Sequence, residues 1–483
     1  MSVQVGRGVS PARRERDPWP GRPRRPRRWA VWPVLIRIRE SSSSSYSSSA
    51  VKAFEYEYES EYEFDDDSRE CIVSNPQPLR LRLGAGHHDR EVEFLLPADW
   101  RVTVCPPRGA PALSATAIRR AFARPVGAAP IRRQARGARS AVILVDDFRR
   151  PTPGETLCLA VIEELIHAGL RKSAISIVLG NGAHRAMTRR EARRRLGSAM
   201  DRVGRVVSHD AFSADVTFVG LTKAGTPVLV NRVAADADFS VAISTVYPHA
   251  LTAWGGGAKM VLPGICHVST CYYHHTRVRG GGVWSGNPGD SPSRRDLEEA
   301  AALFGLDVAV CAVINPKKEL CGLRVGHPTQ AHRSAVKLAR QVYHTDTQGL
   351  APQLVIANLY PFDGDPTQFS KAEVPARRCG APILILADFA DSCDWHGAYD
   401  GPRKAYLQRG PLPVPERTPE LLRKAEVFLY SPQVGPGCAP RNRNWYCESD
   451  WARLMAALSQ RFPSADVLVL PAAPLQIPAK AGK

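Results

Sequence analysis

The sequence lacks several patterns that would assign it at once to a known class of protein. Within 483 residues, no apolar run approaches the roughly 18–20 residues that a membrane-spanning helix needs. The 11 cysteines include no C-x-x-C pair, which argues against a structural zinc site. The phosphate-binding pattern GxxxxGK[ST] is absent, as are the helix-turn-helix, RRM and zinc-finger patterns of nucleic-acid-binding proteins. We therefore expect a cytoplasmic protein with neither a membrane nor a nucleic acid as its partner.

The basic surplus of the chain does not identify a ligand by itself. The formal net charge is +18, while 23% charged and 44% hydrophobic residues are ordinary values for a globular protein. A basic surface attracts polyanions, and it attracts small carboxylates equally well. The charge is thus compatible with a small anionic substrate, and the choice depends on the motifs.

The first 77 residues are predicted to form a disordered, low-complexity tail. Residues 22–28 are a Pro/Arg run, residues 41–49 are nearly all serine, and residues 55–67 alternate acidic with aromatic side chains. Such segments bury too little apolar surface to offset the entropy lost on ordering. We expect the folded part of the chain to begin at Pro78.

From Pro78 onward, short apolar runs alternate with helical patterns. The predicted strands are 141–145, 175–179, 239–243, 354–357, 383–386, 427–430 and 467–470. The predicted helices are 154–170, 296–304, 333–343, 419–425 and 451–460. This alternation predicts an α/β fold with mainly parallel sheets. The Gly- and Pro-rich stretch at 280–292 suggests a division into two α/β domains, 78–290 and 291–475.

Polar clusters directly follow several of these apolar runs. In chain order they contribute Asp147 and Arg150 from DDFRRPTP, His184 from GNGAHR, His249 from STVYPHA, and Gln368 and Lys371 from PFDGDPTQFSK. Any one cluster alone is more readily explained as a solvated loop. Since ligands of parallel sheets bind beyond the carboxyl ends of the strands, the clusters together predict one shared site.

The densest pattern is PHALTAWGGGAKMVLPGI, residues 248–265. Gly255, Gly256 and Gly257 would let the backbone approach a ligand closely, and their N–H groups could form a nest for an anion. Lys259 follows them and could contact a phosphate or act as a nucleophile.

Histidines surround this pattern. His184, His249 and His275 are candidates for general acid/base catalysis or for binding nickel or zinc. His267 and His274 lie close to His275 and compete with it for a metal role.

The motifs DDFRRPTP, GNGAHRAMT, PHALTAWGGGAKMVLPGI, the pair His274–His275 and QFSK resemble, in order and spacing, the nickel-dependent lactate racemase family. The resemblance covers roughly residues 80–475. It implies two α/β domains with the active site in the cleft between them. It also implies a nickel-pincer nucleotide, made by dedicated cofactor-synthesis enzymes, and racemisation or epimerisation of a small anionic 2-hydroxy acid.

The resemblance further assigns roles to single residues. Lys259 would carry the cofactor covalently, His275 would bind the nickel, and His184 and His249 would transfer protons. Asp147, Arg150 and the glycines 255–257 would hold the cofactor. Gln368 and Lys371 would hold the substrate, and Lys371 would also assist the reaction by pairing with the substrate carboxylate or keto oxygen.

One residue departs from the family pattern. Arg149 stands where the family has a small hydroxyl residue, and the extra cation is expected either to change the phosphate contacts or to favour a more acidic substrate. The alternative function is a metal-dependent hydrolase or lyase on the same fold that has lost the pincer cofactor. That alternative predicts activity with zinc and no covalent group on Lys259.

Overall fold

The computed structural model describes residues 72–74, 78–86, 88–278, 291–365, 368–389, 426–433 and 445–479. All of them belong to one compact unit, residues 67–483. The predicted helix 419–425 and the predicted tail, apart from residues 72–74, lie outside the described residues.

A six-stranded sheet carries the motifs of the middle of the chain. Its order is β14-β13-β10-β5-β6-β7, and every neighbouring pair is parallel except β13 with β14. The strands are β5 (Ala141–Asp146), β6 (Ile175–Gly180), β7 (Arg205–Ser208), β10 (Phe239–Thr245), β13 (Val308–Ile314) and β14 (Leu320–Gly326). All residues of β5 and β10 are buried, which explains why these strands are continuous apolar runs without alternation.

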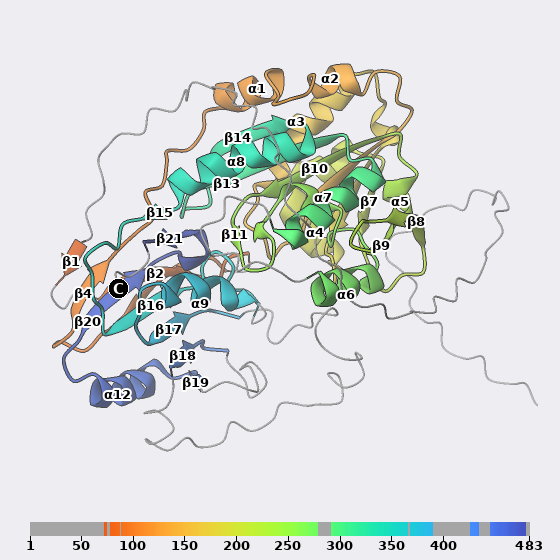
Figure 1. Ribbon diagram of the computed structural model, residues 1–483. Coiled ribbons are helices and arrows are strands. Elements are labelled where there is room, and N and C mark those ends of the chain that lie inside the picture. The colour runs from red at the N-terminus through yellow and green to blue at the C-terminus, as the bar shows by residue number, and fades with distance from the viewer. Residues whose placement is uncertain are drawn as a thin grey trace, which may run out of the picture. The chain divides into compact units, whose positions relative to one another are not determined.

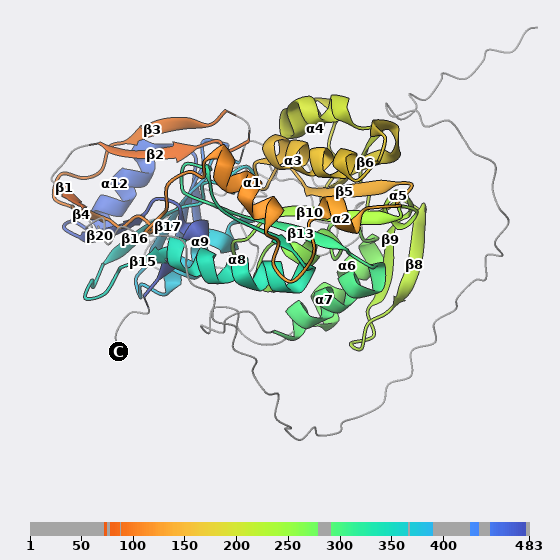
Figure 2. The ribbon, with the colours of Figure 1, turned by 90° about the horizontal axis from the view of Figure 1, so that it is seen from above.

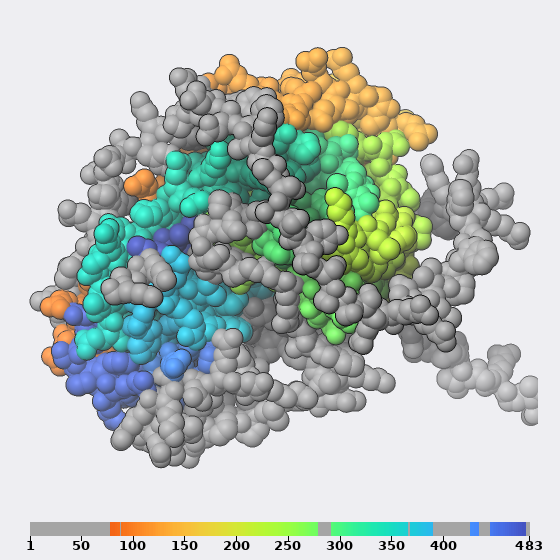
Figure 3. All heavy atoms as spheres, in the orientation of Figure 1, coloured from red at the N-terminus to blue at the C-terminus, as the bar shows by residue number. Residues whose placement is uncertain are grey.

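Helices cover both faces of this sheet (Figures 1 and 2). On one face lie α3 (Gly154–His167) and α4 (Arg189–Leu196); on the other lie α6 (Val268–Arg277), α7 (Pro292–Phe304) and α8 (Pro328–Val342). The buried residues of α8 recur at helical spacing, for example Ala331, Ala335 and Ala339, while the outer side of the helix forms part of the molecular surface (Figure 3).

A seven-stranded sheet holds the C-terminal motifs. Its order is β1-β4-β20-β16-β17-β18-β19, parallel throughout except for the edge pair β1 with β4. The strands are β1 (Ile72–Ser74), β4 (Arg101–Val104), β16 (Leu354–Asn358), β17 (Ile383–Leu386), β18 (Val427–Tyr430), β19 (Trp445–Glu448) and β20 (Asp466–Leu470). Helix α9 (Ser370–Arg377) packs on one face, and α12 (Trp451–Arg461) with the hairpin β2–β3 (Leu79–Leu83, Arg90–Phe94) packs on the other.

Shorter elements complete the described fold. They are α1 (Ala115–Ala123), α2 (Ile131–Gln134), α5 (Arg232–Ala235), the hairpin β8–β9 (Val216–Leu221, Pro227–Asn231), and the small pairs β11–β12 (Pro248–His249, Ala253–Trp254) and β15–β21 (His344–Thr345, Ile477–Pro478). In the part of the chain that is described, no helix combines the length and apolar character that crossing a membrane requires.

The α/β class with mainly parallel sheets is confirmed, but the chain is distributed between the sheets differently from the predicted division at residue 290. Strand β4 precedes that position and belongs to the seven-stranded sheet, whereas β13 and β14 follow it and complete the six-stranded sheet. Strand β1 falls inside the predicted tail and pairs with β4, so the tail prediction does not hold for residues 72–74. The antiparallel edge pairing of β1 gives this short segment a partner that its composition does not reveal.

Candidate active site

A cavity of about 450 Å³ lies at the carboxyl ends of β5, β6 and β10, and the segment at the start of α9 completes its wall. Of the predicted site residues, those lining it are Asp147, Arg150, His184, His249, Gly256, Lys259, His275, Gln368 and Lys371. The volume lies within the range typical of small-ligand and cofactor pockets. Four separate polar clusters and the glycine–lysine segment thus meet at one place, as the position of parallel strand ends requires.

His184 and Asp147 form a buried hydrogen-bonded pair. Nδ1 of His184 lies 2.7 Å from Oδ2 of Asp147. Although burial by itself raises the pKa of the Asp147 carboxyl, His184 and Arg150 bring that pKa well below its ordinary value. An ionised carboxylate only accepts hydrogen bonds, so the imidazole proton resides on Nδ1 and the lone pair on Nε2. Burial lowers the pKa of His184, which favours the neutral ring.

His249 has the opposite tautomer. Its Nδ1 accepts hydrogen bonds from the backbone N–H groups of Leu251 and Thr252, at 3.1 and 3.4 Å. The proton of the neutral ring is therefore on Nε2, which lies 3.0 Å from Nζ of Lys259. Burial, followed by the charges of Lys259 and Lys371, lowers the pKa of His249 well below its ordinary value.

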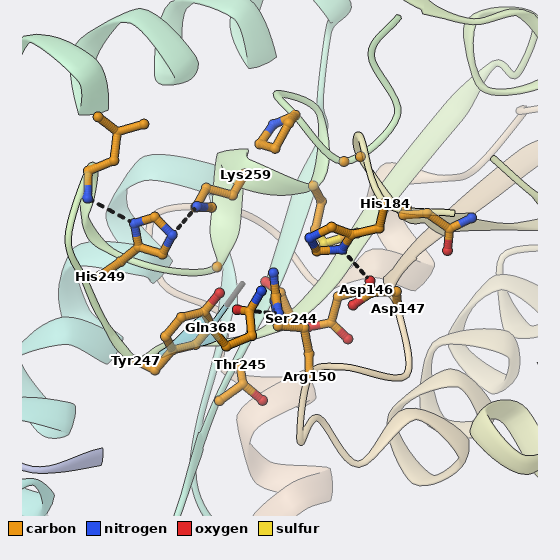
Figure 4. Close-up of a pocket in the computed structure, with 18 of the residues that line it drawn as sticks. Asp146, Asp147, Arg150, His184, Ser244, Thr245, Tyr247, His249, Lys259 and Gln368 are labelled. Atoms are coloured by element: carbon orange, nitrogen blue, oxygen red, sulfur yellow. Dashed lines mark hydrogen bonds and ion pairs between the residues drawn. The ribbon is translucent and has the colours of Figure 1, made fainter. Parts of the chain in front are cut away.

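The surroundings of the Lys259 side chain favour its uncharged form over the ammonium ion. Burial, reinforced by the positive charges of Arg150 and Lys371, lowers the pKa of Lys259 well below its ordinary value. A neutral amine accepts the hydrogen bond from Nε2 of His249, so the two groups fit each other. Figure 4 shows His249 and His184 on opposite sides of the pocket with Lys259 between them.

The structure distinguishes His275 from its neighbour His274. His275 lines the cavity, and its Nδ1 donates to the carbonyl oxygen of Cys271 at 2.7 Å, which leaves the lone pair on Nε2. Burial lowers the pKa of His275 to about 3, so the ring is neutral, as a metal ligand must be. Both nitrogens of His274 are instead engaged, with Asp296 at 2.7 Å and Ser293 at 3.0 Å.

Two of the three N–H groups of the glycine run are already used inside the protein and so do not contribute to the expected anion nest. The N–H of Gly255 donates to the carbonyl oxygen of Tyr247 at 2.7 Å, and that of Gly257 donates to Oγ of Ser244 at 2.9 Å. The glycines are required instead because the loop is packed tightly. A Cβ on Gly255 would lie 2.5 Å from the Tyr247 ring, and one on Gly256 would lie 2.8 Å from the carbonyl oxygen of Thr245.

Two buried side chains, on α8 and α7, form hydrogen bonds with the carbonyl oxygens of this loop. Nε2 of His332, on α8, lies 2.8 Å from the carbonyl oxygen of Gly255. Nη1 of Arg294, on α7, donates to the carbonyl oxygens of Trp254 and Gly256. The local role that these contacts indicate for the glycines is to bring Lys259 into the cavity on a rigid loop.

The seven-stranded sheet contributes a cationic contact to the cavity. Oε1 of Gln368 accepts hydrogen bonds from Nζ of Lys371 and from Nη1 of Arg150. Burial, followed by the charge of Arg150, lowers the pKa of Lys371 to about 7. Two cationic groups and an amide around one point suit a carboxylate.

From the sequence, the extra cation at Arg149 is expected either to change the phosphate contacts or to favour a more acidic substrate, but the structure gives it no direct access to the cavity. Arg149 does not line the cavity, and only 2% of its side chain is exposed. It is turned away from the pocket by two carboxylates, with Nη1 3.4 Å from Oδ2 of Asp147 and Nε 3.0 Å from Oδ2 of Asp365. The extra positive charge is therefore compensated inside the protein.

Sequence reasoning missed two aromatic residues beside the cationic contact. The Tyr247 ring lines the cavity and lies 4.7 Å, centre to centre, from the ring of Phe362. Nζ of Lys371 lies 5.8 and 5.5 Å from the two ring centres. Tyr247 follows β10 just as His249 does, so the strand-end rule would have selected it had aromatic residues been considered. Among the described residues there is no group of three or more His, Cys, Asp or Glu side chains placed to hold a metal ion.

Comparisons with known proteins find similarity to lactate racemases. Residues 87–282 match the family described as the lactate racemase N-terminal domain. The chain is 25% identical over 288 residues to the lactate racemase of Thermoanaerobacterium thermosaccharolyticum, an alignment that covers 58% of this chain and 67% of that protein. It is 23% identical to the lactate racemase of Lactiplantibacillus plantarum, covering 58% and 68% of the two chains.

Solved structures share the fold. The lactate racemase apoprotein from T. thermosaccharolyticum superposes with a TM-score of 0.62 and 20% identity, over 83% of this chain and all of that one. A protein from Thermotoga maritima superposes with a TM-score of 0.52 and 16% identity, over 73% and 96% of the two chains. The resemblance seen in the motifs is thereby supported: residues 87–282 match the lactate racemase N-terminal domain, and the fold is similar to that of a lactate racemase apoprotein.

Proposed function

We propose that this protein is an isomerase that racemises or epimerises a 2-hydroxy acid, lactate or a close relative. In this proposal, hydride leaves C2 and returns to the opposite face, and a nickel-pincer nucleotide is attached to Lys259. The observation that carries the proposal is the arrangement of two histidines, His184 and His249, on opposite sides of the pocket with the Lys259 amine between them.

The chain's own residues fit the cofactor. Burial lowers the pKa of Lys259, which favours the nucleophilic amine that a covalent attachment needs. His275 offers Nε2 as a nitrogen ligand because its Nδ1 is fixed by Cys271. The glycine loop holds Lys259 but uses the N–H groups of Gly255 and Gly257 internally, so we assign the phosphate of the cofactor to other donors. When bound, the cofactor supplies the hydride acceptor.

The protein supplies proton transfer and orientation. Nε2 of His184 takes the hydroxyl proton, and Asp147 stabilises the imidazolium that results. Lys371 and Gln368, with Arg150, hold the substrate carboxylate while the planar 2-keto acid turns its other face. His249 donates a hydrogen bond from its Nε2–H to the substrate oxygen from the opposite side. The proton taken by His184 returns to that oxygen when the hydroxy acid forms again. A group on each side of the pocket is what an inversion at one carbon requires.

Maturation by cofactor-synthesis enzymes is part of the proposal, since the pincer nucleotide must be made before Lys259 can carry it. The cytoplasmic location expected from the sequence stays a prediction.

A substrate labelled with deuterium at C2 tests the reaction. The matured protein would be incubated in ordinary water with one enantiomer. The product would be separated by chiral chromatography, and its mass would be measured by mass spectrometry. Hydride return predicts the opposite enantiomer with the deuterium retained. Loss of the label to solvent would show removal of C2 as a proton and would contradict the mechanism.

A His184→Asn variant tests whether His184 is the base in the same experiment. It keeps a hydrogen-bonding side chain beside Asp147 but has no basic nitrogen. We expect it to racemise about 10²–10⁴-fold more slowly. An unchanged rate would remove His184 from the proposed chemistry.

A further inference from the structure

The buried guanidinium of Arg149 lies between two carboxylates that come from different parts of the chain. Asp147 follows β5 of the six-stranded sheet, and Asp365 follows β16 of the seven-stranded sheet. The Arg149 side chain is 2% exposed, and so is that of Asp365. A buried cation is tolerated only when opposite charges compensate it, and these two ion pairs provide that compensation.

Each of the two carboxylates also contacts a residue of the proposed site. Oδ2 of Asp147, which faces Arg149 at 3.4 Å, is the same atom that accepts from His184 at 2.7 Å. Oδ2 of Asp365, which faces Arg149 at 3.0 Å, accepts from Nε2 of Gln368 at 3.4 Å. The backbone N–H of Gln368 also donates to the carbonyl oxygen of Asp365, at 3.1 Å.

A continuous series of charged and polar contacts therefore runs from the proposed base to the proposed substrate contact. It passes from His184 through Asp147, Arg149 and Asp365 to Gln368. Arg149 and Asp365 do not line the cavity, and the ion pair between them joins the loop after β5 to the loop after β16. The centre of the Phe148 ring lies 4.6 Å from the guanidinium carbon of Arg149, so the ring packs against the guanidinium.

Resting on the function proposed above, we propose that Arg149 is a positioning residue that fixes the loop bearing Gln368 and Lys371 relative to the His184–Asp147 pair. It acts through the two carboxylates and does not touch the substrate. Arginine suits the task because its planar, permanently charged fork can pair with two acceptors at once. A small hydroxyl residue at this position has neither the reach nor the charge to make both contacts.

Amide hydrogen exchange of the full-length protein tests this role without any turnover. The variants are Arg149→Met, Asp365→Asn and the two combined. Because Arg149→Met removes the bridge, we expect the protected amides of Gln368 and Ala372 to exchange about tenfold faster. Asp365→Asn should have a similar effect, and the double variant should be no worse than the stronger single one, since both changes break the same link.

Arg132→Met is the matched control. Arg132 forms an ion pair with Glu164 at 2.8 Å, between α2 and α3, and neither residue lines the cavity. Its loss should leave exchange at Gln368 and Ala372 unchanged. Equal exchange at these amides in Arg149→Met and in the control would overturn the proposal, and so would additive effects in the double variant.

Arg149→Lys keeps the measurement decisive if Arg149→Met does not fold. Lysine keeps the charge but lacks the fork, so exchange at Gln368 should lie between that of the native protein and that of Asp365→Asn. In the matured enzyme, the same variant should raise KM for the 2-hydroxy acid by more than it lowers kcat, because the substrate contacts move relative to an intact base. A change confined to global stability, with KM unaltered, would contradict a positioning role.

The outcome for Arg149 can be separated from the outcome for the function. Hydrogen exchange depends only on the folded chain, so it is informative even if no hydroxy acid is racemised. Faster exchange in Arg149→Met with no racemisation by the matured native protein would contradict the proposed function and leave the structural link intact. Unchanged exchange in Arg149→Met together with racemisation by the matured native protein would contradict the positioning role of Arg149 and leave the proposed function intact.

Discussion

Nδ1 of His184 lies 2.7 Å from Oδ2 of Asp147, and this pair determines which nitrogen of the ring faces the cavity. The carboxylate fixes the proton on Nδ1 and leaves the lone pair on Nε2. His249 is fixed in the other tautomer by the backbone amides of Leu251 and Thr252. The two histidines are thus chemically different in the resting protein, although their residue type is the same.

Replacing Asp147 tests the importance of this tautomer. Asp147→Asn keeps the shape but can turn an N–H toward Nδ1, which favours the proton on Nε2. We expect kcat of the matured enzyme to fall about 10²–10⁴-fold while the cofactor stays attached. Steady-state kinetics with intact mass spectrometry of the same sample measure both quantities. A kcat within a factor of two or so of the native value would show that the tautomer does not matter.

The pH dependence of substrate binding should follow Lys371. Burial and the charge of Arg150 lower the pKa of Lys371 to about 7, so the ammonium ion is present below pH 7 and is lost above it. In the proposed function the ammonium ion holds the substrate carboxylate, so KM should rise as the pH increases through 7, approaching about tenfold per unit at higher pH.

Lys371→Arg provides the control for that profile. Its guanidinium stays charged throughout, so KM should vary little between pH 7 and 9, whatever its absolute value. Parallel KM profiles for the two proteins would assign the pH dependence to another group.

The tight packing of the glycine loop predicts a position-specific loss of stability. Gly257 has a φ of +61°, and a Cβ there would lie 2.9 Å from the His332 ring. Gly137 has a φ of +82° with nothing within 4 Å of the added Cβ. Gly137→Ala should therefore cost only the strain of a left-handed backbone, about 1–2 kcal/mol.

Gly257→Ala should cost more than Gly137→Ala, because the clash with His332 adds to the same strain. It should also displace Lys259 and slow the reaction of that amine with an acylating reagent. Urea unfolding and mass-mapped labelling measure the two effects. Equal losses of stability in the two variants would mean that the loop has room for a side chain.

Stability at acid pH should depend on His209. The residue is fully buried, Nε2 lies 2.9 Å from the carbonyl oxygen of Cys266, and burial lowers its pKa to about 4. In the unfolded chain the ring takes up a proton near pH 6.5. The unfolded state therefore binds more protons between pH 6.5 and 4, and stability falls as the pH decreases through that window, by about 3 kcal/mol from this residue.

His209→Gln removes that contribution. Its free energy of unfolding, measured against pH by urea titration, should fall less steeply between pH 6.5 and 4 than that of the native protein. Identical slopes would assign the acid sensitivity to the other buried histidines.

The sequence predicted the positions of the strands that form the site well, but it predicted poorly which groups the residues after those strands contact. Runs such as Ala141–Val145 are apolar because both faces of the sheet are covered, and the polar residue that follows each run lies at the carboxyl edge. The gathering of His184, His249 and Lys371 was therefore foreseeable. The sequence could not predict that the N–H groups of Gly255 and Gly257 already have partners within the protein, because this depends on the loop conformation.

Arg149 illustrates the same limit for charges. Its neighbours in sequence suggested a ligand contact, but Asp365, more than two hundred residues later, reverses that interpretation. Similarly, β13 and β14 join the six-stranded sheet and β4 joins the other because strand pairing is decided by the packing of the whole chain. Local patterns identify which residues end a strand, and only the fold shows what each side chain meets there.

The central claim is that Lys259 carries a nickel-containing cofactor, and mass measurement of the matured protein tests it most directly. The protein and its Lys259→Ala variant would be produced together with the cofactor-synthesis enzymes, and intact mass, peptide mapping and nickel content would be measured on each. We predict an added mass that maps to Lys259 with stoichiometric nickel in the native protein, and neither in the variant. An unmodified Lys259 without nickel, in protein produced together with those enzymes, would contradict the account.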